Sequence, residues 1–161
     1  MKIIFLDIDG VLNHEDFYRE RFEKRYDDGA IEHPYSEIDP KTVQRLNKII
    51  EETGANIVIS STWRHSGLEY CKKVLEYHGF RGNIIDITPM CRCGLCVRGN
   101  EIDKWIRDNN DITGGHFKFK DYVILDDDND MLFTQKDNFI QTNPFIGLTD
   151  YIMEQVIKKL K

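Results

Sequence analysis

The amino-acid sequence predicts an α/β protein with a three-layer, Rossmann-like architecture, in which helices cover both faces of a parallel sheet. Short apolar runs alternate along the chain with longer segments that have the apolar spacing of amphipathic helices. The runs are continuously apolar, as strands are when both faces of a sheet are buried. Three of them, "IIFLDID", "IVISST" and "VILDDD", end in polar residues. Because ligands bind beyond the carboxyl ends of the strands in such sheets, we expect these three ends to meet at one site.

The first predicted strand covers residues 2–7, and a charged, aromatic-rich insertion at 14–39 follows it. The insertion has no clear period, so we expect a short helical or irregular excursion over one end of the sheet. Its length is too short for a typical independently folded core. We therefore expect a site with a minimal cap or none, within a single domain that spans residues 1–161.

A helix is predicted over residues 39–54, with Asp39 as its N-cap and Gly54 at its end. Pro40 suits its first turn. Its apolar face would consist of Val43, Leu46, Ile49 and Ile50. The remaining predicted elements are, in chain order, a strand at 55–60, a helix at 68–80, a strand at 82–88, a loop at 90–99, a helix at 100–110 capped by Asn100, strands at 121–127 and 138–143, and a helix at 148–160 capped by Thr149.

The overall charge and hydropathy restrict the classes of partner. A net charge of −6 argues against a broad basic surface that binds nucleic acid through its phosphates, but it leaves room for a local basic groove. The chain has no apolar run of about 18 residues, so no membrane span is expected. Its first residues lack the apolar length of a signal peptide, and we therefore expect a cytoplasmic protein.

The cysteines are Cys71, Cys91, Cys93 and Cys96. In a reducing compartment thiols are expected rather than disulfides. The last three form a C-x-C-x2-C cluster, and a structural zinc with Cys71 as the fourth ligand is an alternative. However, C-x-C is tighter than the usual C-x2-C pair, and Cys71 also fits the apolar face of its helix. Free thiols are therefore the default expectation.

The acidic residues at the strand ends indicate a metal site. Two acids lie at or just after the end of the first strand, and four lie at or just after the end of the strand at 121–127: Asp7, Asp9, Asp126, Asp127, Asp128 and Asp130. Side chains two residues apart on a strand lie on the same side, so the first two acids repel each other unless a cation lies between them. Oxygen ligands at this density favour a hard divalent cation, most plausibly Mg²⁺.

Groups that bind anions are predicted beside these acids. Ser60 and Ser61 offer hydroxyl and backbone donors, and Arg64 or Arg98 supplies a positive charge. Arg64 could equally be a structural ion-pair partner. Anion donors next to a divalent cation are typical of a phosphate site.

These residues match a known pattern. The segment "FLDIDGVL" resembles the first motif (DxDGxx) of the haloacid dehalogenase-like (HAD) hydrolase superfamily, "IVISS" resembles its second motif, and "VILDDDND" its fourth. The three motifs occur in order over residues 3–130, and the whole chain fits the core fold. Together, "FLDIDGVLN", "ISSTWR", "RGNEIDKWI" and "YVILDDDNDM" also look like the small HAD domains found alone or fused to bacterial and phage RNA-repair proteins.

The resemblance implies catalytic roles for two acids and one hydroxyl. Asp7 would be the nucleophile that attacks phosphorus and forms an aspartyl-phosphate. Asp9 would protonate the leaving oxygen and then take a proton from the hydrolytic water, a second acid that favours a phosphatase over a dehalogenase. Ser60 would hold a phosphoryl oxygen, with Ser61 as the alternative register.

The resemblance also implies a Mg²⁺ site and a phosphate-binding cation. Asp126 would bind the ion together with Asp7 and the Asp9 carbonyl, while Asp127 and Asp130 would orient metal-bound water. The third motif of the superfamily is a single Lys or Arg. Arg98 lies just before a predicted helix from which it could reach the phosphate, and Lys104, further inside that helix, is the alternative. Trp63 is interpreted as a lid over the core or, equally, as a base- or sugar-stacking surface.

The implied activity is a Mg²⁺-dependent phosphomonoesterase acting on a nucleotide or a phosphorylated nucleic-acid end. Two alternatives use the same fold: a non-enzymatic phospho-acceptor domain similar to a response-regulator receiver, and a nucleic-acid-binding module. A receiver carries its acceptor aspartate on a different strand from its acid pair, and here "SST" holds that position. The presence of both Asp7 and Asp9 disfavours a module without catalysis. The substrate and the oligomeric state stay open.

Overall fold

The computed structural model describes residues 1–28, 37–91, 96–109 and 121–161. Within these residues the chain forms a five-stranded, entirely parallel sheet with the order β3-β2-β1-β4-β5. The strands are β1 (Ile3–Leu6), β2 (Asn56–Ile59), β3 (Ile84–Ile87), β4 (Tyr122–Asp126) and β5 (Phe139–Gln141). The helices are α1 (Glu15–Asp28), α2 (Pro40–Thr53), α3 (Leu68–Tyr77), α4 (Arg98–Asp108) and α5 (Asp150–Leu160), with short 3₁₀ helices η1 (Thr62–Ser66) and η2 (Phe133–Gln135). The predicted α/β class is confirmed.

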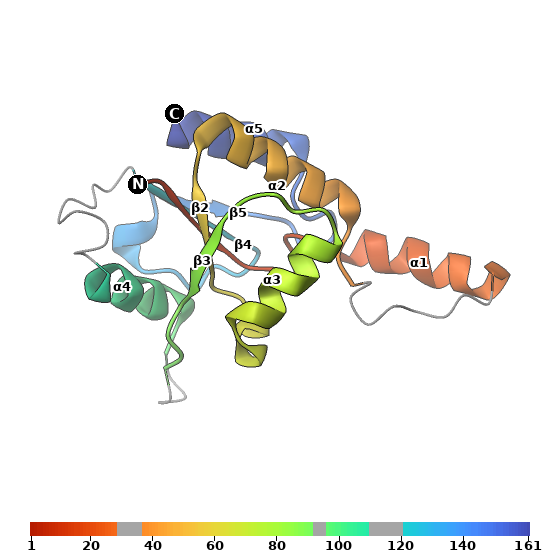
Figure 1. Cartoon of the computed structure of the whole chain (residues 1–161), viewed down its shortest axis with the longest axis horizontal. Coiled ribbons are helices and arrows are strands. Elements are labelled where there is room, and N and C mark those ends of the chain that lie inside the picture. Colours follow the sequence, from red (N-terminus) through yellow and green to blue (C-terminus); the bar gives the residue numbers. More distant parts are fainter. Residues whose placement is uncertain (29–36, 92–95, 110–120) are drawn as a thin grey trace.

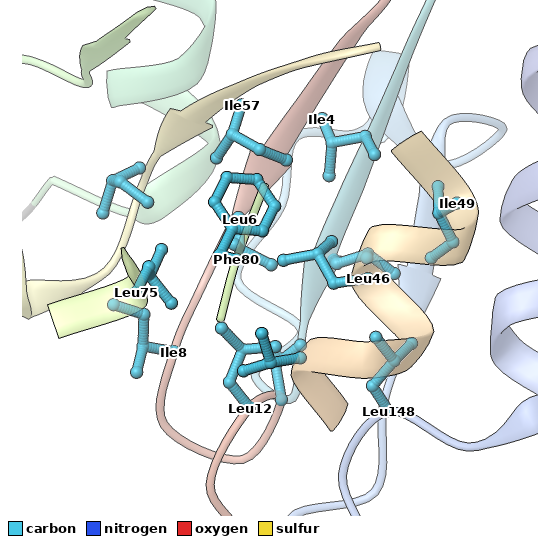
Figure 2. Packing of buried hydrophobic residues seen from close by; sticks show 14 of the residues in the cluster. Ile4, Leu6, Ile8, Leu12, Leu46, Ile49, Ile57, Leu75, Phe80 and Leu148 are labelled. Atoms are coloured by element: carbon cyan, nitrogen blue, oxygen red, sulfur yellow. The ribbon is translucent and has the colours of Figure 1, made fainter. Parts of the chain in front are cut away.

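The helices α2, α3 and α5 cover one face of the sheet and α4 covers the other (Figure 1). One buried apolar cluster contains every second residue of the central strands together with residues of α2, α3 and α5. The helices contribute, among others, Leu46, Leu75 and Val156. Figure 2 shows part of this cluster, with Leu6 of β1 between Ile57 of β2 and Leu46 of α2. The opposite sheet face packs on α4. The sheet is therefore buried on both faces, which explains why its strands are continuously apolar.

The smaller cluster is built around aromatic rings. Phe5 of β1 contacts Trp105 of α4 and Tyr122 of β4 edge to face, with ring centroids 5.4 and 5.7 Å apart. Edge-to-face contacts of this kind add to the stabilisation that burial alone provides. They fix α4 against the strand that carries the two acids of the first motif.

Most predicted helix ends follow from local capping. The Asp39 side chain accepts a hydrogen bond from Lys41 N at 2.9 Å, and Gly54 ends α2 with φ +66°. Thr149 caps α5 by accepting from Ile152 N at 3.3 Å. These ends were predicted correctly because the capping residues are neighbours in the sequence.

The start of α4 differs from the prediction. The helix begins at Arg98, with Val97 at the N-cap, and not after Asn100. Its first two free N–H groups are satisfied from a distant loop, because Asp130 Oδ2 accepts from Arg98 N at 2.8 Å and Asp130 O accepts from Gly99 N at 3.3 Å. A cap supplied by tertiary contact leaves no local signal in the sequence.

The insertion at 14–39 contributes the helix α1, which extends away from the sheet in Figure 1. Residues 29–36 of the insertion lie outside the described residues. The expectation of helical structure is thus confirmed for the part of the insertion that the structure describes, whereas its predicted place over one end of the sheet is not. No helix within the described ranges combines the length and apolar character that crossing a membrane requires.

Two of the four cysteines differ from the expectation of free thiols. Cys91 and Cys96 are joined by a disulfide across the loop between β3 and α4. Cys71 is a free thiol, as expected, and it is fully buried in the core on α3, where its predicted packing role is confirmed. The disulfide leaves Cys91 and Cys96 without the thiolates that a zinc ion would need. Cys93 lies outside the described residues. The sequence spacing alone could not show that the loop brings the first and last cysteine of the cluster together.

Candidate active site

The five strand ends form one polar row across the carboxyl edge of the sheet. In spatial order the row consists of Thr88, Ser60, Asp7, Asp126 and Thr142, one residue from each strand end. The backbone N–H of each member except Asp126 donates to a carbonyl at the end of the neighbouring strand, at 2.9 to 3.0 Å. The row follows from the register, because Leu6 pairs with both Ile59 and Leu125, and the next residue on each strand is polar.

Three carboxylates of this edge converge. One carboxylate oxygen each from Asp7, Asp126 and Asp127 lie within 4.8 Å of one another. Asp7 is 6 % exposed and Asp126 is fully buried. Gly10, with φ +70°, allows Asp127 to approach, since a Cβ at this glycine would lie 2.7 Å from Asp127 Cβ and closer still to the carboxylate. The close approach of these acids is therefore built into the backbone.

Burial makes this cluster electrostatically costly. Burial first, and then the charge of Asp7, raises the pKa of Asp126 to about 8. Burial also raises the pKa of Asp7, although the charge of Arg98 and a hydrogen bond from Ser61 act in the opposite direction. The pKa of Asp127 is raised by burial as well. Without a cation, the cluster would take up protons near neutral pH.

Buried polar atoms without partners are concentrated at the same edge. Within the described residues, six buried side-chain atoms have no hydrogen-bond partner. They are Ser60 Oγ, Arg64 Nε, Thr88 Oγ1, Arg98 Nη1, Asp126 Oδ2 and Asp130 Oδ1. Each belongs to the polar row, to η1, to the first turn of α4 or to the loop that follows β4. Since an unsatisfied buried polar group costs about 1–3 kcal/mol, their concentration at one place indicates a site for a polar ligand.

The donor set fits a magnesium ion. Asp126 Oδ2 has no hydrogen bond, and its nearest opposite charge is Arg98 Nε at 3.7 Å. This oxygen belongs to a group of three carboxylates, and carboxylate oxygens are the protein ligands that Mg²⁺ prefers. The chemistry of Asp7, Asp126 and Asp127 thus matches the ion expected from the sequence.

Asp9 lies apart from this cluster. Its side chain is exposed and accepts hydrogen bonds from Trp63 Nε1, at 3.2 Å to Oδ1 and 3.0 Å to Oδ2. Asn13 Nδ2 also donates to Oδ1 at 2.8 Å. The carboxylate of Asp9 is therefore held by two side chains and is not one of the three clustered groups; the predicted use of its carbonyl as a metal ligand stays a prediction.

The predicted phosphate-binding cation lies at the first turn of α4. Arg98 is 14 % exposed in its side chain, pairs with Asp126 at 3.7 Å and leaves Nη1 buried without a partner. Lys104, the alternative, pairs with Asp108 at 2.6 Å, with half of its side chain exposed. Asp130, predicted as a metal ligand, lies outside the carboxylate cluster and uses Oδ2 to cap α4. The structure thus places Arg98, and not Lys104, beside the acids.

Of the two roles predicted for Arg64, phosphate ligand or structural ion-pair partner, the structure shows the second. Its Nη1 donates to Ser60 O at 2.6 Å and Ser61 O at 2.7 Å, and its Nη2 pairs with Glu101 Oε2 at 2.5 Å. Both terminal nitrogens are therefore engaged inside the protein. The guanidinium holds the end of β2 against α4, and we assign it a structural role because a buried charge needs such partners. Ser61, the alternative phosphate ligand, caps η1 by accepting from Trp63 N at 3.3 Å.

Several residues of the site were not identified from the sequence. Thr88 and Thr142 complete the polar row, and Thr142 Oγ1 donates to Gly10 O at 2.9 Å. Asn13 and Glu101 act through contacts with Asp9 and Arg64. The two threonines lie at the ends of the predicted strands 82–88 and 138–143, and this position was a usable signal. The other two contacts depend on tertiary structure.

The comparison with protein-family models identifies the chain. Residues 3–152 match the HAD domain in Swiss Army Knife RNA repair proteins. Because this match covers most of the chain, the protein belongs to that family. The comparison with curated proteins returns no match. Membership of the HAD superfamily supports a phosphatase-type role and is consistent with the acidic cluster at the sheet edge.

Proposed function

We propose that the protein is a Mg²⁺-dependent phosphomonoesterase that acts through an aspartyl-phosphate on Asp7. One observation carries this proposal: Asp7, Asp126 and Ser60 share the polar row, and each of the last two leaves a buried side-chain oxygen without a partner. A phosphate ester and a divalent cation together would satisfy these atoms. The same edge also holds the buried, unpartnered Nη1 of Arg98.

Asp7 supplies the nucleophile. Its Oδ1 accepts a hydrogen bond from Ile8 N at 2.8 Å, which helps to fix the carboxylate, and one of its two oxygens attacks. The new bond joins this oxygen to phosphorus while the bond from phosphorus to the leaving oxygen breaks. The cluster of Asp7, Asp126 and Asp127 would hold Mg²⁺, which when bound offsets the repulsion between the carboxylates and the anionic ester.

The donors of the site orient the phosphoryl group. Ser60 Oγ and Arg98 Nη1 are both buried and unpartnered, so they can donate to phosphoryl oxygens at little further cost. Asp9 transfers the proton: it protonates the leaving oxygen in the first step and accepts a proton from water in the second. Its exposed position is compatible with a leaving group that extends into solvent.

We further propose that the substrate is a nucleotide or a phosphorylated nucleic-acid end. Two observations support this. The family that the chain belongs to is described from RNA repair proteins. The described part of the insertion after the first motif is the single helix α1, so no large cap over the site is evident in the described residues. An open site accommodates a polymer end more readily than an enclosed one.

The test is phosphate release from a panel of esters, measured with and without Mg²⁺. The panel contains nucleotides, sugar phosphates, and oligonucleotides with a 3′- or 5′-phosphate. We expect Mg²⁺-dependent release, strongest for nucleotides or oligonucleotide ends, and loss of turnover in Asp7→Asn. Full activity of Asp7→Asn would overturn the proposed mechanism. Salt-dependent RNA binding without any hydrolysis would favour a binding module instead.

A further inference from the structure

We infer that Trp63 and Asn13 are positioning residues that hold the Asp9 carboxylate for proton transfer. They thereby determine kcat/KM for the hydrolysis of esters with poor leaving groups. This inference rests on the proposed function, because it assigns roles within that reaction. It concerns a tryptophan and an asparagine that lie outside the carboxylate cluster.

The two donors reach Asp9 from different elements. Trp63 lies on η1, after β2, and Asn13 lies in the loop after β1. The indole Nε1 contacts both carboxylate oxygens at 3.2 and 3.0 Å, and Asn13 Nδ2 contacts Oδ1 at 2.8 Å. An exposed carboxylate without such contacts would sample several rotamers. The three contacts select one orientation of the group.

Both donors are themselves held in place. The Asn13 side-chain oxygen accepts from Gly10 N at 3.1 Å, which fixes the amide and directs its Nδ2 toward Asp9. The Trp63 ring packs against the larger apolar cluster and contacts Tyr70 of α3, with centroids 6.3 Å apart. The two donors, which together form a clamp on the Asp9 carboxylate, are therefore anchored to the core, and not to mobile surface side chains.

The contacts distinguish the two oxygens of Asp9. A carboxylate oxygen has two lone pairs in the plane of the group. Oδ1 accepts from both Asn13 and Trp63, whereas Oδ2 accepts from Trp63 alone. Oδ2 is therefore the oxygen with a lone pair left for a proton. The clamp fixes which atom carries the proton as well as where the group points.

The proton-transfer steps can then be written in full. As the oxygen of Asp7 bonds to phosphorus, the bond to the leaving oxygen breaks and the proton on Asp9 Oδ2 moves to that oxygen. In the second step water attacks phosphorus, its proton returns to Asp9 Oδ2, and the bond between phosphorus and Asp7 breaks to release phosphate. Only the first step depends on the basicity of the leaving oxygen, and kcat/KM reports that step.

The leaving group provides a readout that a merely structural role would not change. A p-nitrophenolate leaves without needing a proton, whereas the alkoxide of an alkyl phosphate does need one. A variant with a misplaced Asp9 should lose activity mainly on the alkyl ester. The chain also offers a matched control, because its other tryptophan, Trp105, donates Nε1 to Asp86 Oδ2 at 2.6 Å in the cluster packed under α4.

The experiment measures kcat/KM with Mg²⁺ for p-nitrophenyl phosphate and for an alkyl phosphate. Losing one hydrogen bond to a charged group corresponds to roughly a tenfold to hundredfold effect. We expect Trp63→Phe and Asn13→Ala to lower kcat/KM by roughly that factor on the alkyl ester and by less than about threefold on the aryl ester, with KM nearly unchanged. Asp9→Asn should show the same selectivity, more strongly, and Trp105→Phe should show none.

A second measurement does not depend on activity. The chain has two tryptophans, and hence two indole N–H resonances in a ¹⁵N spectrum. Trp63→Phe assigns them by the loss of one. In Asp9→Ala, we expect the Trp63 resonance to shift while the Trp105 resonance does not move, and an unmoved Trp63 resonance would overturn the inferred contact.

The outcomes separate this inference from the proposed function. Equal losses on the two esters in Trp63→Phe, or no loss on either, would overturn the positioning role while the phosphatase assignment stands. Absence of Mg²⁺-dependent hydrolysis of both esters by the unchanged protein would overturn the proposed function, and this inference with it.

Discussion

The strand bodies and the carboxyl edge of the sheet differ in how completely their buried polar groups find hydrogen-bond partners. Ile3–Leu6 of β1 is fully buried, apolar and paired on both sides by neighbouring strands. One residue later, the polar row to which Asp7 belongs contains buried carboxylates and hydroxyls, some without hydrogen-bond partners. The strand bodies stabilise the fold, whereas the edge reduces stability. Such an edge is retained when a ligand uses it.

The largest expected effect comes from removing one charge of the edge. Asp126→Asn should lower Mg²⁺-dependent kcat/KM by about a thousandfold or more, because in the proposed mechanism a ligand of the metal and its charge are lost. The same change removes a buried charge, so the metal-free variant should melt roughly 3–8 °C above the unchanged protein at pH 8. Calorimetry in EDTA measures the second effect. A lower melting temperature would contradict the assigned cost of the edge.

A change in a strand body should have the opposite effects, a large loss of stability and a small loss of activity. Leu6→Ala removes a fully buried side chain next to Asp7 and should cost about 3 kcal/mol of unfolding free energy. Denaturant titration measures this loss. Below the melting temperature, kcat/KM of the folded fraction should fall less than about tenfold, since the polar row itself is intact. A Leu6→Met variant keeps the volume and serves as the control.

The close approach of Asp127 to the backbone of Gly10 is tested by substituting this glycine. An alanine there is strained at φ +70° and its Cβ would displace Asp127. We expect Gly10→Ala to lose about 1–3 kcal/mol of stability and to bind Mg²⁺ at least about tenfold more weakly, as judged by the Mg²⁺ dependence of the melting temperature. Gly79→Ala has a similar strain, with φ +81°, but an added Cβ there meets nothing within 4 Å. Unchanged Mg²⁺ binding in Gly10→Ala would argue against the placement of Asp127.

The smallest expected effect, taken per pH unit, is a dependence of the stability of the metal-free protein on pH. The pKa of Asp126 is 3.8 in its ordinary state and about 8 in the fold, so the folded state holds the proton more tightly. Stability should therefore fall as pH rises between these values, by at most about 1.4 kcal/mol, or roughly 3–5 °C in melting temperature, per pH unit. Saturating Mg²⁺ or Asp126→Asn should flatten the slope. A metal-free stability that rises from pH 5 to 8 would contradict the raised pKa.

The sequence predicted the site where local signals and strand register determine it. Asp7, Ser60 and Asp126 each follow an apolar run directly, and parallel pairing then places them side by side. The two caps of α2 were predicted correctly because the capping residues are adjacent to the helix in the sequence. The apolar pattern alone was enough to predict a sheet buried on both faces.

The sequence did not predict contacts between distant segments. Asp130 caps α4 and moves its start to Arg98, and Glu101 engages Arg64, for which phosphate binding was one of two predicted roles. Trp63 was interpreted as a lid or a stacking surface, yet its indole N–H is bonded to Asp9. In each case two side chains far apart in the sequence meet only after folding, and neither residue type reveals its partner.

The central claim is that Asp7 becomes bonded to phosphorus beside a Mg²⁺ ion held with Asp126 and Asp127. A crystal structure of the protein with Mg²⁺ and beryllium fluoride, a mimic of an aspartyl-phosphate, tests it most directly. We expect the beryllium on an oxygen of Asp7, its fluorides within reach of Ser60 and Arg98, and Mg²⁺ in contact with the other two carboxylates. Beryllium absent from Asp7 at saturating concentrations, or Mg²⁺ bound elsewhere, would contradict it.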